Sequence, residues 1–190
     1  FTVEQKILNA SVVLTTELIN NEIKFCSGTL IKPAEGSTNP RIITNHHCFA
    51  KTNPETDLSI DELLPESCVR TKVFFNFRYS SQQNVFKRDC LPGSLYARFD
   101  HDIAVFELDT TEIPLPRDYE PLELDRSPEL PVDVAAMIVH YPKIDEHFSQ
   151  PRGENYRIPL ASVTTDNCSV IGPFDPSEYY LDRTLRFGLR

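Results

Sequence analysis

Short runs of β-branched and aromatic residues, each ended by a turn-forming cluster, constrain the fold of this chain more than any other feature. Pro, Gly, Asn, Asp and Ser fill the breaks, as in the segment 32–37, Lys-Pro-Ala-Glu-Gly-Ser. Long amphipathic helical patterns are absent from the sequence. The runs of the first half are Ser11–Leu18, Lys24–Ile31, Arg41–Thr44, Val69–Arg78, Ser94–Phe99 and Ile103–Leu108. Their hairpin-like spacing predicts a small antiparallel barrel or sandwich.

After Asp109 the character of the chain changes. Residues 110–131 carry charges throughout and prolines at positions 114, 116, 121, 128 and 131. Because proline removes a backbone donor and fixes φ, we expect an extended, irregular linker here rather than a central strand. Further runs typical of strands follow at Val132–His140, Arg157–Thr164, Ser169–Gly172 and Tyr179–Phe187. These runs are too few to close a second unit by themselves.

Charge and cysteine content narrow the possible partners and the compartment. The formal net charge of −9 argues against a nucleic-acid-binding protein. No apolar run reaches the ~18–20 residues that a membrane span needs. Residues 1–6 lack the features of a signal peptide, so we expect either a cytosolic chain or a mature form that has lost its targeting segment. Five cysteines, none spaced Cys-x-x-Cys, favour an oxidising compartment, and their odd number leaves one free or paired outside this chain.

A candidate general base and a candidate orienting acid lie beside two of the predicted strands. Residues 44–48, Thr-Asn-His-His-Cys, follow the run that begins at Arg41, and Asp102 directly precedes the run that ends at Leu108. Nucleophilic hydrolysis needs a base near a Ser or Cys, and a further group that fixes the tautomer of the base. A His just after a strand is held rigidly, and a carboxylate at a strand start can accept its Nδ1–H. The pattern therefore indicates hydrolytic chemistry.

Other interpretations of these residues stay open at this point. A single His46 or His47 is more often structural than catalytic. The His-His-Cys cluster also offers ligands that Zn²⁺ accepts, although adjacent residues rarely both reach one ion. Asp100 competes with Asp102 as orienting acid, but the direct junction with Ile-Ala-Val favours Asp102. His101 is expected near the substrate side, without an assigned role.

The sequence resembles the chymotrypsin-like (trypsin-like) serine peptidases in three segments that occur in the family's order. They are Phe25-Cys26-Ser27-Gly28-Thr29-Leu30-Ile31, Thr44-Asn45-His46-His47-Cys48 and Asp102-Ile103-Ala104-Val105-Phe106-Glu107-Leu108. Residues 138–142, Ile-Val-His-Tyr-Pro, are similar to the opening of the second barrel in bacterial glutamyl- and lysyl-endopeptidases. The resemblance implies an all-β fold of two antiparallel six-stranded Greek-key barrels, the second incomplete in this chain. Residues 1–109 would form the N-terminal barrel, 110–131 the linker, and 132–190 the first part of the C-terminal barrel.

The family's motifs assign roles to individual residues. His47 is implied as the general base, because it directly precedes Cys48, and Asp102 as the orienting acid. The family usually has small residues where Asn45 and His46 stand. The resemblance implies a secreted serine endopeptidase that acts on proteins or peptides and needs no cofactor and no metal, with no nucleic acid or membrane as partner. The disulfides that it implies are Cys26–Cys48 and Cys68–Cys90.

The family's nucleophile segment, Gly-x-Ser-Gly, is absent, since none of the six glycines stands two residues before a serine. Cys168 is left over by the two implied disulfides, and Tyr179–Arg190 resembles the strand that leads to the nucleophile. We therefore expect a zymogen cleaved after Arg190 into two chains, with the serine on a C-terminal partner that is disulfide-linked through Cys168. The alternative is a non-catalytic binding protein on the same fold, a pseudoprotease that has lost its nucleophile.

Overall fold

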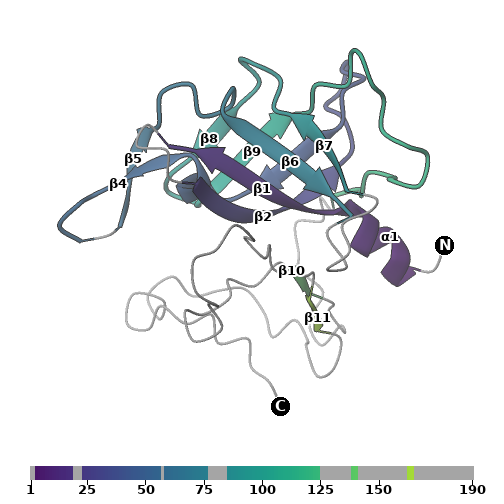
Figure 1. Cartoon of the computed structure of the whole chain (residues 1–190), viewed down its shortest axis with the longest axis horizontal. Coiled ribbons are helices and arrows are strands. Elements are labelled where there is room, and N and C mark those ends of the chain that lie inside the picture. Colours follow the sequence, from purple (N-terminus) through teal and green to yellow (C-terminus); the bar gives the residue numbers. More distant parts are fainter. Residues whose placement is uncertain are drawn as a thin grey trace.

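The structure is a computed structural model, and it describes residues 3–18, 23–56, 58–76, 85–124, 138–140 and 162–164. Within these ranges the chain is mostly strand, so the all-β class expected from the sequence is confirmed. The strands of the main sheet are β1 Ser11–Glu17, β2 Ile23–Ile31, β3 Arg41–Thr44, β6 Thr71–Phe75, β7 Phe86–Asp89, β8 Tyr96–Arg98 and β9 Ile103–Glu107. They pair antiparallel in the order β7-β6-β1-β2-β3-β9-β8, and Figure 1 shows the sheet together with the short helix near the N-terminus. Two small sheets pair β4 (Ala50–Thr52) with β5 (Ser59–Leu63), and β10 (Ile138–His140) with β11 (Ser162–Thr164).

The main sheet closes on itself where β7 and β9 end. The backbone N–H of Leu91 donates to Glu107 O at 2.8 Å, and an antiparallel bridge pairs Cys90 with Leu108. These contacts join the end of β7 to the end of β9, so that the strands run around a ring in the order β1-β2-β3-β9-β7-β6. Apart from β10 and β11, the region expected to form the second barrel lies outside the described residues.

The hydrophobic core fills the inside of this ring. Every second side chain of β3, β6 and β9 is buried, among them Ile42, Val73 and Phe106. The register places Ile42 opposite Phe106 and Leu14 opposite Val73, so inward side chains of neighbouring strands meet. Phe49, fully buried just beyond β3, packs edge-on against Phe106 with ring centroids 5.7 Å apart. This contact anchors the turn that follows β3 to the core.

A short helix, α1 (Val3–Ala10), leads directly into β1 and was not expected from the sequence. Its residues include good helix formers, but eight residues are too few to show a clear helical period. The buried Asn9 fastens the helix, because its Nδ2 donates to Asp118 O at 2.6 Å. In the described ranges, no helix has both the length and the apolar character needed to cross a membrane.

The described part of the linker, residues 110–124, contains no helix and no named strand, in line with its proline content. It lies against the main sheet: Leu122 N–H donates to Leu30 O at 3.0 Å, and Lys32 N–H donates to Leu122 O at 2.9 Å. The ring of Tyr119 packs edge-on against Phe75, with centroids 5.5 Å apart. Residues 125–131 lie outside the described ranges.

Several elements differ from those that the sequence indicated. The strands β4, β5 and β7 were not expected, and β6 is shorter than the run Val69–Arg78. The runs Val132–His140 and Arg157–Thr164 contain β10 and β11. The strands expected at Ser169–Gly172 and Tyr179–Phe187 lie outside the described residues, as does Cys168.

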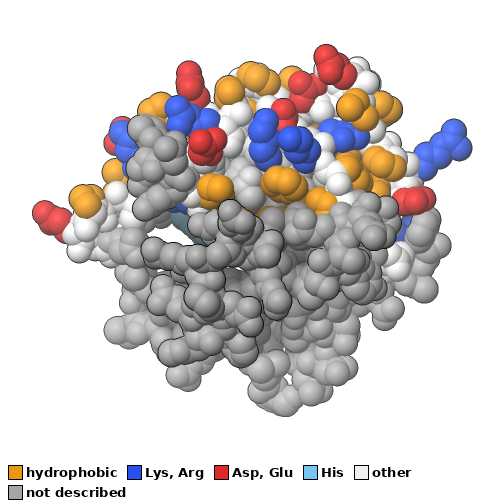
Figure 2. Space-filling view, in the orientation of Figure 1, with side chains coloured by type: hydrophobic (Ala, Val, Ile, Leu, Met, Phe, Trp, Pro, Cys, Tyr) orange, Lys and Arg blue, Asp and Glu red, His pale blue; other side chains and the backbone are white. Residues whose placement is uncertain are grey.

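Acidic and basic side chains are mixed over the described part of the face that Figure 2 shows. Among the described residues, Lys72 Nζ lies 3.0 Å from Asp89 Oδ1, and Arg98 pairs with Asp100.

Gly28, in the middle of β2, lets β1 and β3 pack closely against it. A Cβ at this position would lie 2.6 Å from Leu14 Cδ1 and 2.9 Å from Ile42 Cγ2, both in fully buried side chains. We expect Gly28→Ala to lower the free energy of unfolding by about 1–3 kcal/mol, because the core must shift to accept the methyl group. Urea unfolding would measure the loss. Thr29→Ala, next to it on β2, should cost clearly less, and equal losses would contradict the packing explanation.

Candidate active site

A single turn of 3-10 helix, η1 (His46–Cys48), follows β3 after one extended residue, Asn45. Phe49 N–H donates to His46 O at 2.9 Å and closes the turn. His46 and Cys48 are buried, with 2% and 1% of their surface exposed. The side chain of His47, in contrast, is 51% exposed. Because its two neighbours point into the protein, His47 is the residue of the turn that presents its ring to the outside.

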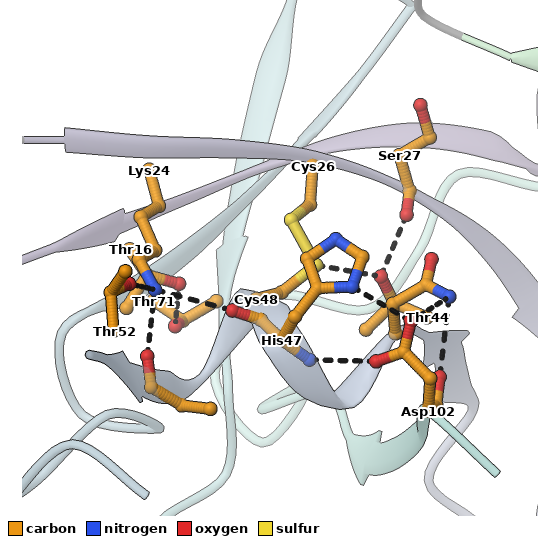
Figure 3. The surroundings of a disulfide bond; sticks show 12 residues. Thr16, Lys24, Cys26, Ser27, Thr44, His47, Cys48, Thr52, Thr71 and Asp102 are labelled. Atoms are coloured by element: carbon orange, nitrogen blue, oxygen red, sulfur yellow. Dashed lines mark hydrogen bonds and ion pairs between the residues drawn. A yellow bond between two sulfur atoms is a disulfide. The ribbon is translucent and has the colours of Figure 1, made fainter. Parts of the chain in front are cut away.

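Asp102 lies next to this ring, in the connection between β8 and β9 (Figure 3). His47 Nδ1 is 2.8 Å from Asp102 Oδ2, and the backbone N–H of His47 donates to Asp102 Oδ1 at 2.9 Å. A carboxylate oxygen can only accept, so Nδ1 carries the proton and Nε2 of the neutral ring is left as the acceptor. The backbone of Asp102 is left-handed, with φ of +47°. Asp is among the residues that tolerate this region.

The sequence predicted that these two residues meet, and the structure places them together. Their separation in the chain is 55 residues, and the register of β3 with β9 brings them into contact. Thr44 pairs with Ala104 at the ends of these two strands. Because the two strands run antiparallel, the residues that follow β3 lie opposite those that precede β9. His47 follows β3, and Asp102 precedes β9.

A disulfide and a lysine hold the turn from the side of β2. Cys26 on β2 is bonded to Cys48, with an S–S distance of 2.04 Å. Lys24, two residues earlier, donates from Nζ to Ala50 O at 2.6 Å and to His47 O at 3.3 Å (Figure 3). Thr44 Oγ1 also donates to Ser27 O on β2, at 2.7 Å. Sequence reasoning missed Lys24, although its spacing of two from Cys26 puts both on one face of β2.

Asn45 is a further residue of the site that the sequence did not reveal. Its Nδ2 donates to Oδ2 and to the backbone O of Asp102, both at 3.2 Å. The sequence showed only that Asn45 differs from the small residue usual in the family. The role of the Asn45 amide could be recognised only once the structure showed that Asp102 lies next to it.

The other candidate histidines lie apart from this hydrogen-bonded pair. His46 packs edge-on against Phe99, with centroids 5.4 Å apart, and its Nε2 is 3.9 Å from Asp61 Oδ1. His101 is exposed, and its Nε2 lies 3.8 Å from Asp100 Oδ2. These surroundings give His46 a packing contact and leave His101 at the surface.

Asp100 is engaged by Arg98 instead of by His47. Arg98 Nε donates to Asp100 Oδ1 at 3.0 Å. This hydrogen bond lowers the pKa of the Asp100 carboxyl below its ordinary value, with the charge of Arg98 adding to the effect. In the described structure Asp102 is therefore the acid that His47 contacts, and Asp100 belongs to a surface ion pair.

A zinc site at the turn does not fit the state of its cysteines. The sulfur atoms of Cys26 and Cys48 and one ring nitrogen of His47 lie within 4.8 Å of one another, close enough for a shared ion. However, both sulfurs are consumed by their disulfide, and metals bind the thiolate.

The second disulfide, Cys68–Cys90, lies beside β6 and β7, with an S–S distance of 2.02 Å.

A His–carboxylate pair on a closed antiparallel sheet, with a disulfide beside the His, is compatible with a domain of the serine-peptidase type. Comparison with family models agrees: the model described as a trypsin-like peptidase domain matches residues 26–183, and the chain therefore belongs to the trypsin-like peptidase family. This match bears on the family, so the similarity to bacterial glutamyl- and lysyl-endopeptidases stays a prediction.

Among solved structures, one titled "Structure of GrC" is similar to this chain at 14% identity, with a TM-score of 0.48. The similarity covers 82% of this chain and 59% of that chain, so the present sequence spans somewhat more than half of that length. No curated protein matches the sequence.

Proposed function

We propose that this chain is part of a secreted serine endopeptidase in which His47 is the general base and Asp102 is the acid that orients it. The observation that carries the proposal is the bidentate contact between them. One oxygen of Asp102 accepts from the His47 backbone and the other lies 2.8 Å from Nδ1. The ring is thereby fixed in position and tautomer with Nε2 as its free acceptor, which is the arrangement that activates a hydroxyl nucleophile.

The chemical steps assigned to this chain are proton transfers at His47 Nε2. As the serine hydroxyl attacks the carbonyl of a peptide bond, Nε2 takes its proton. The ring then carries a positive charge, which the ionised carboxylate of Asp102 stabilises at 2.8 Å. Nε2 next gives the proton to the leaving amine as the C–N bond breaks, and the acyl group stays on the serine as an ester. Water then attacks this ester, Nε2 takes a proton from the water, and the proton goes to the serine oxygen as the ester bond breaks. These steps require no cofactor.

The serine is proposed to come from polypeptide outside these 190 residues, on a partner chain, since none of the six glycines here stands two residues before a serine. Cys168 supports a covalent link to this partner, because the other four cysteines are consumed by the two disulfides. Two disulfides in a domain of this size also favour an oxidising, extracellular compartment. The domain division at 109 and 131 and the second barrel belong to the same proposal.

Labelling with a fluorophosphonate, followed by electrophoresis with and without reductant, tests the function and the two-chain arrangement together. We expect the label on a polypeptide other than this one, migrating with this chain until reductant separates them. The matched His47→Ala preparation should label far more slowly, because the serine would lack its base.

The remaining outcomes are equally decisive. Label on a single longer polypeptide, unchanged by reductant, would keep the peptidase and overturn the two-chain arrangement. Label within these 190 residues would overturn the placement of the serine. A folded preparation that takes up no label would overturn the peptidase and favour the pseudoprotease.

A further inference from the structure

Asn45 stands at the N-cap position of η1 but does not cap it. Asn is one of the preferred N-cap residues, since its side chain accepts from a free N–H of the first turn. Here the backbone of Asn45 is extended, at φ −92° and ψ 147°, and its side chain makes no cap hydrogen bond. The amide instead donates to two oxygens of Asp102, the backbone O and Oδ2, each at 3.2 Å.

These bonds fix Asp102 from a direction that His47 does not supply. Oδ1 of the carboxylate accepts the His47 backbone N–H, and Oδ2 faces the His47 ring. Among the hydrogen bonds of the described ranges, the one from Asn45 Nδ2 to Oδ2 holds the carboxylate independently of His47. The bond to the backbone O also ties down a residue in the left-handed conformation, directly before β9. Asn45 thus couples the end of β3 to the start of β9 at the acid itself.

We propose that Asn45 is a positioning residue that keeps the Asp102 carboxylate aimed at His47 Nδ1 while the ring gains and loses its proton. The inference rests on the proposed function of the His47–Asp102 pair. Its physical basis is that an amide donor to an ionised carboxylate forms a charge-assisted hydrogen bond. If the carboxylate moved about 1 Å away from the ring, much of the rate gain that comes from a fixed geometry would be lost.

Three substitutions in the complete peptidase separate positioning from capping and from charge. Asn45→Ala removes the amide and should lower kcat by about tenfold to 100-fold, with little change in KM. Asn45→Ser keeps a good N-cap residue, but its hydroxyl ends one bond short of the amide nitrogen. We therefore expect Asn45→Ser to behave like Asn45→Ala.

Asn45→Asp keeps the shape of the side chain and replaces the donor with a second carboxylate. The added negative charge favours the protonated ring of His47, and the ring can act as base only after losing that proton. The acid limb of kcat/KM against pH should therefore move toward higher pH. Asn45→Ala should leave the acid limb of the same pH profile nearly in place, while it lowers the maximum value of kcat/KM.

Asn39 offers a matched control on the same sheet. Its Nδ2 donates to Glu107 Oε2 at 3.1 Å, an amide–carboxylate bond of the same kind at the other end of β9. Asn39→Ala should lower the unfolding midpoint about as much as Asn45→Ala and leave kcat unchanged. Equal losses of kcat in the two variants would overturn positioning in favour of a general effect on stability.

A proton NMR measurement keeps this test separate from that of the proposed function. The proton between His47 Nδ1 and Asp102 gives a resonance far downfield that does not depend on a serine. We expect it to broaden in Asn45→Ala and to persist in Asn39→Ala. A preparation without activity but with these spectra would overturn the proposed function and support the role of Asn45. An unchanged resonance in Asn45→Ala, or full kcat in Asn45→Ser, would overturn that role.

Discussion

Replacing Asp102 with Asn should lower kcat of the complete peptidase by about 10⁴-fold while the chain stays folded. Asp102 accepts two hydrogen bonds from His47, one from the backbone N–H at 2.9 Å and one from the ring at 2.8 Å. An amide has a single acceptor oxygen, so its NH₂ group would face one of these donors. If the oxygen keeps the backbone N–H, the NH₂ group faces Nδ1 and forces the proton to Nε2. A ring protonated at Nε2 cannot accept a proton from the nucleophile.

The substitution tests chemistry rather than folding, because Asn fits the place of Asp102 in shape and in backbone conformation. Asn tolerates the left-handed region, where the φ of Asp102 lies at +47°. The free energy of unfolding, measured by thermal denaturation, should therefore change by no more than about 1 kcal/mol, as is usual for a surface substitution. Steady-state kinetics on a peptide substrate would measure kcat and KM for each variant.

Asp100→Asn is the natural control, since Asp100 is the other acid that the sequence offered for this role. It lies two residues away and is engaged by Arg98 at 3.0 Å, at the protein surface. We expect kcat to stay within about twofold of the unsubstituted enzyme, because an exposed ion pair contributes little. A larger loss from Asp100→Asn than from Asp102→Asn would exchange their roles and contradict the assignment.

The strands that the sequence predicted correctly are those whose own composition favours a strand. β1 contains Val12 and Val13, and β3 contains Ile42 and Ile43, so β-branched residues mark both. In contrast, β4 is Ala-Lys-Thr and β7 is Phe-Lys-Arg-Asp, with few such residues. These segments become strands because they pair with neighbouring strands. β7, for example, pairs along its whole length with β6. Pairing of this kind depends on the closed sheet and leaves no local signal.

The site divides in the same way between motif and geometry. His47 and Asp102 could be predicted because each stands at a marked place, before a cysteine and before a strand. Asn45 and Lys24 act through contacts with Asp102 and Ala50, at separations of 57 and 26 residues in the chain. Which side chains meet there depends on the register between β3 and β9, and on that between β2 and β3. Since a shift of one residue would turn every side chain to the other face, the sequence alone could not give these contacts.

Removing the Cys26–Cys48 disulfide should impair both stability and catalysis, whereas removing Cys68–Cys90 should impair stability alone. Each disulfide links cysteines separated by 22 residues. In the chain-entropy model, equal loops give equal stabilisation, here about 3 kcal/mol for each. Paired Cys→Ala substitutions at the two sites should therefore lower the free energy of unfolding by similar amounts. Denaturant unfolding would measure both losses.

The two disulfide variants should differ in kcat because the two disulfides restrain different parts of the structure. Cys48 belongs to η1 and directly follows His47, so its loss frees one end of the turn that carries this proposed general base. The hydrogen bonds of Lys24 to His47 O and Ala50 O remain, as does the buried side chain of Phe49. We therefore expect kcat to fall by about tenfold rather than to vanish. Cys68–Cys90, beside β6 and β7, is not part of this turn.

Kinetics measured well below both unfolding midpoints separate the two effects, because each variant is then almost fully folded. If both variants lose kcat equally, general loosening of the main sheet explains the loss, and the disulfide beside His47 has no special role. If only the Cys26–Cys48 variant loses activity, the cause lies in the turn. A double-mutant cycle with Lys24→Met would then show whether Lys24 and the disulfide restrain the same motion, since coupled restraints give losses that do not add.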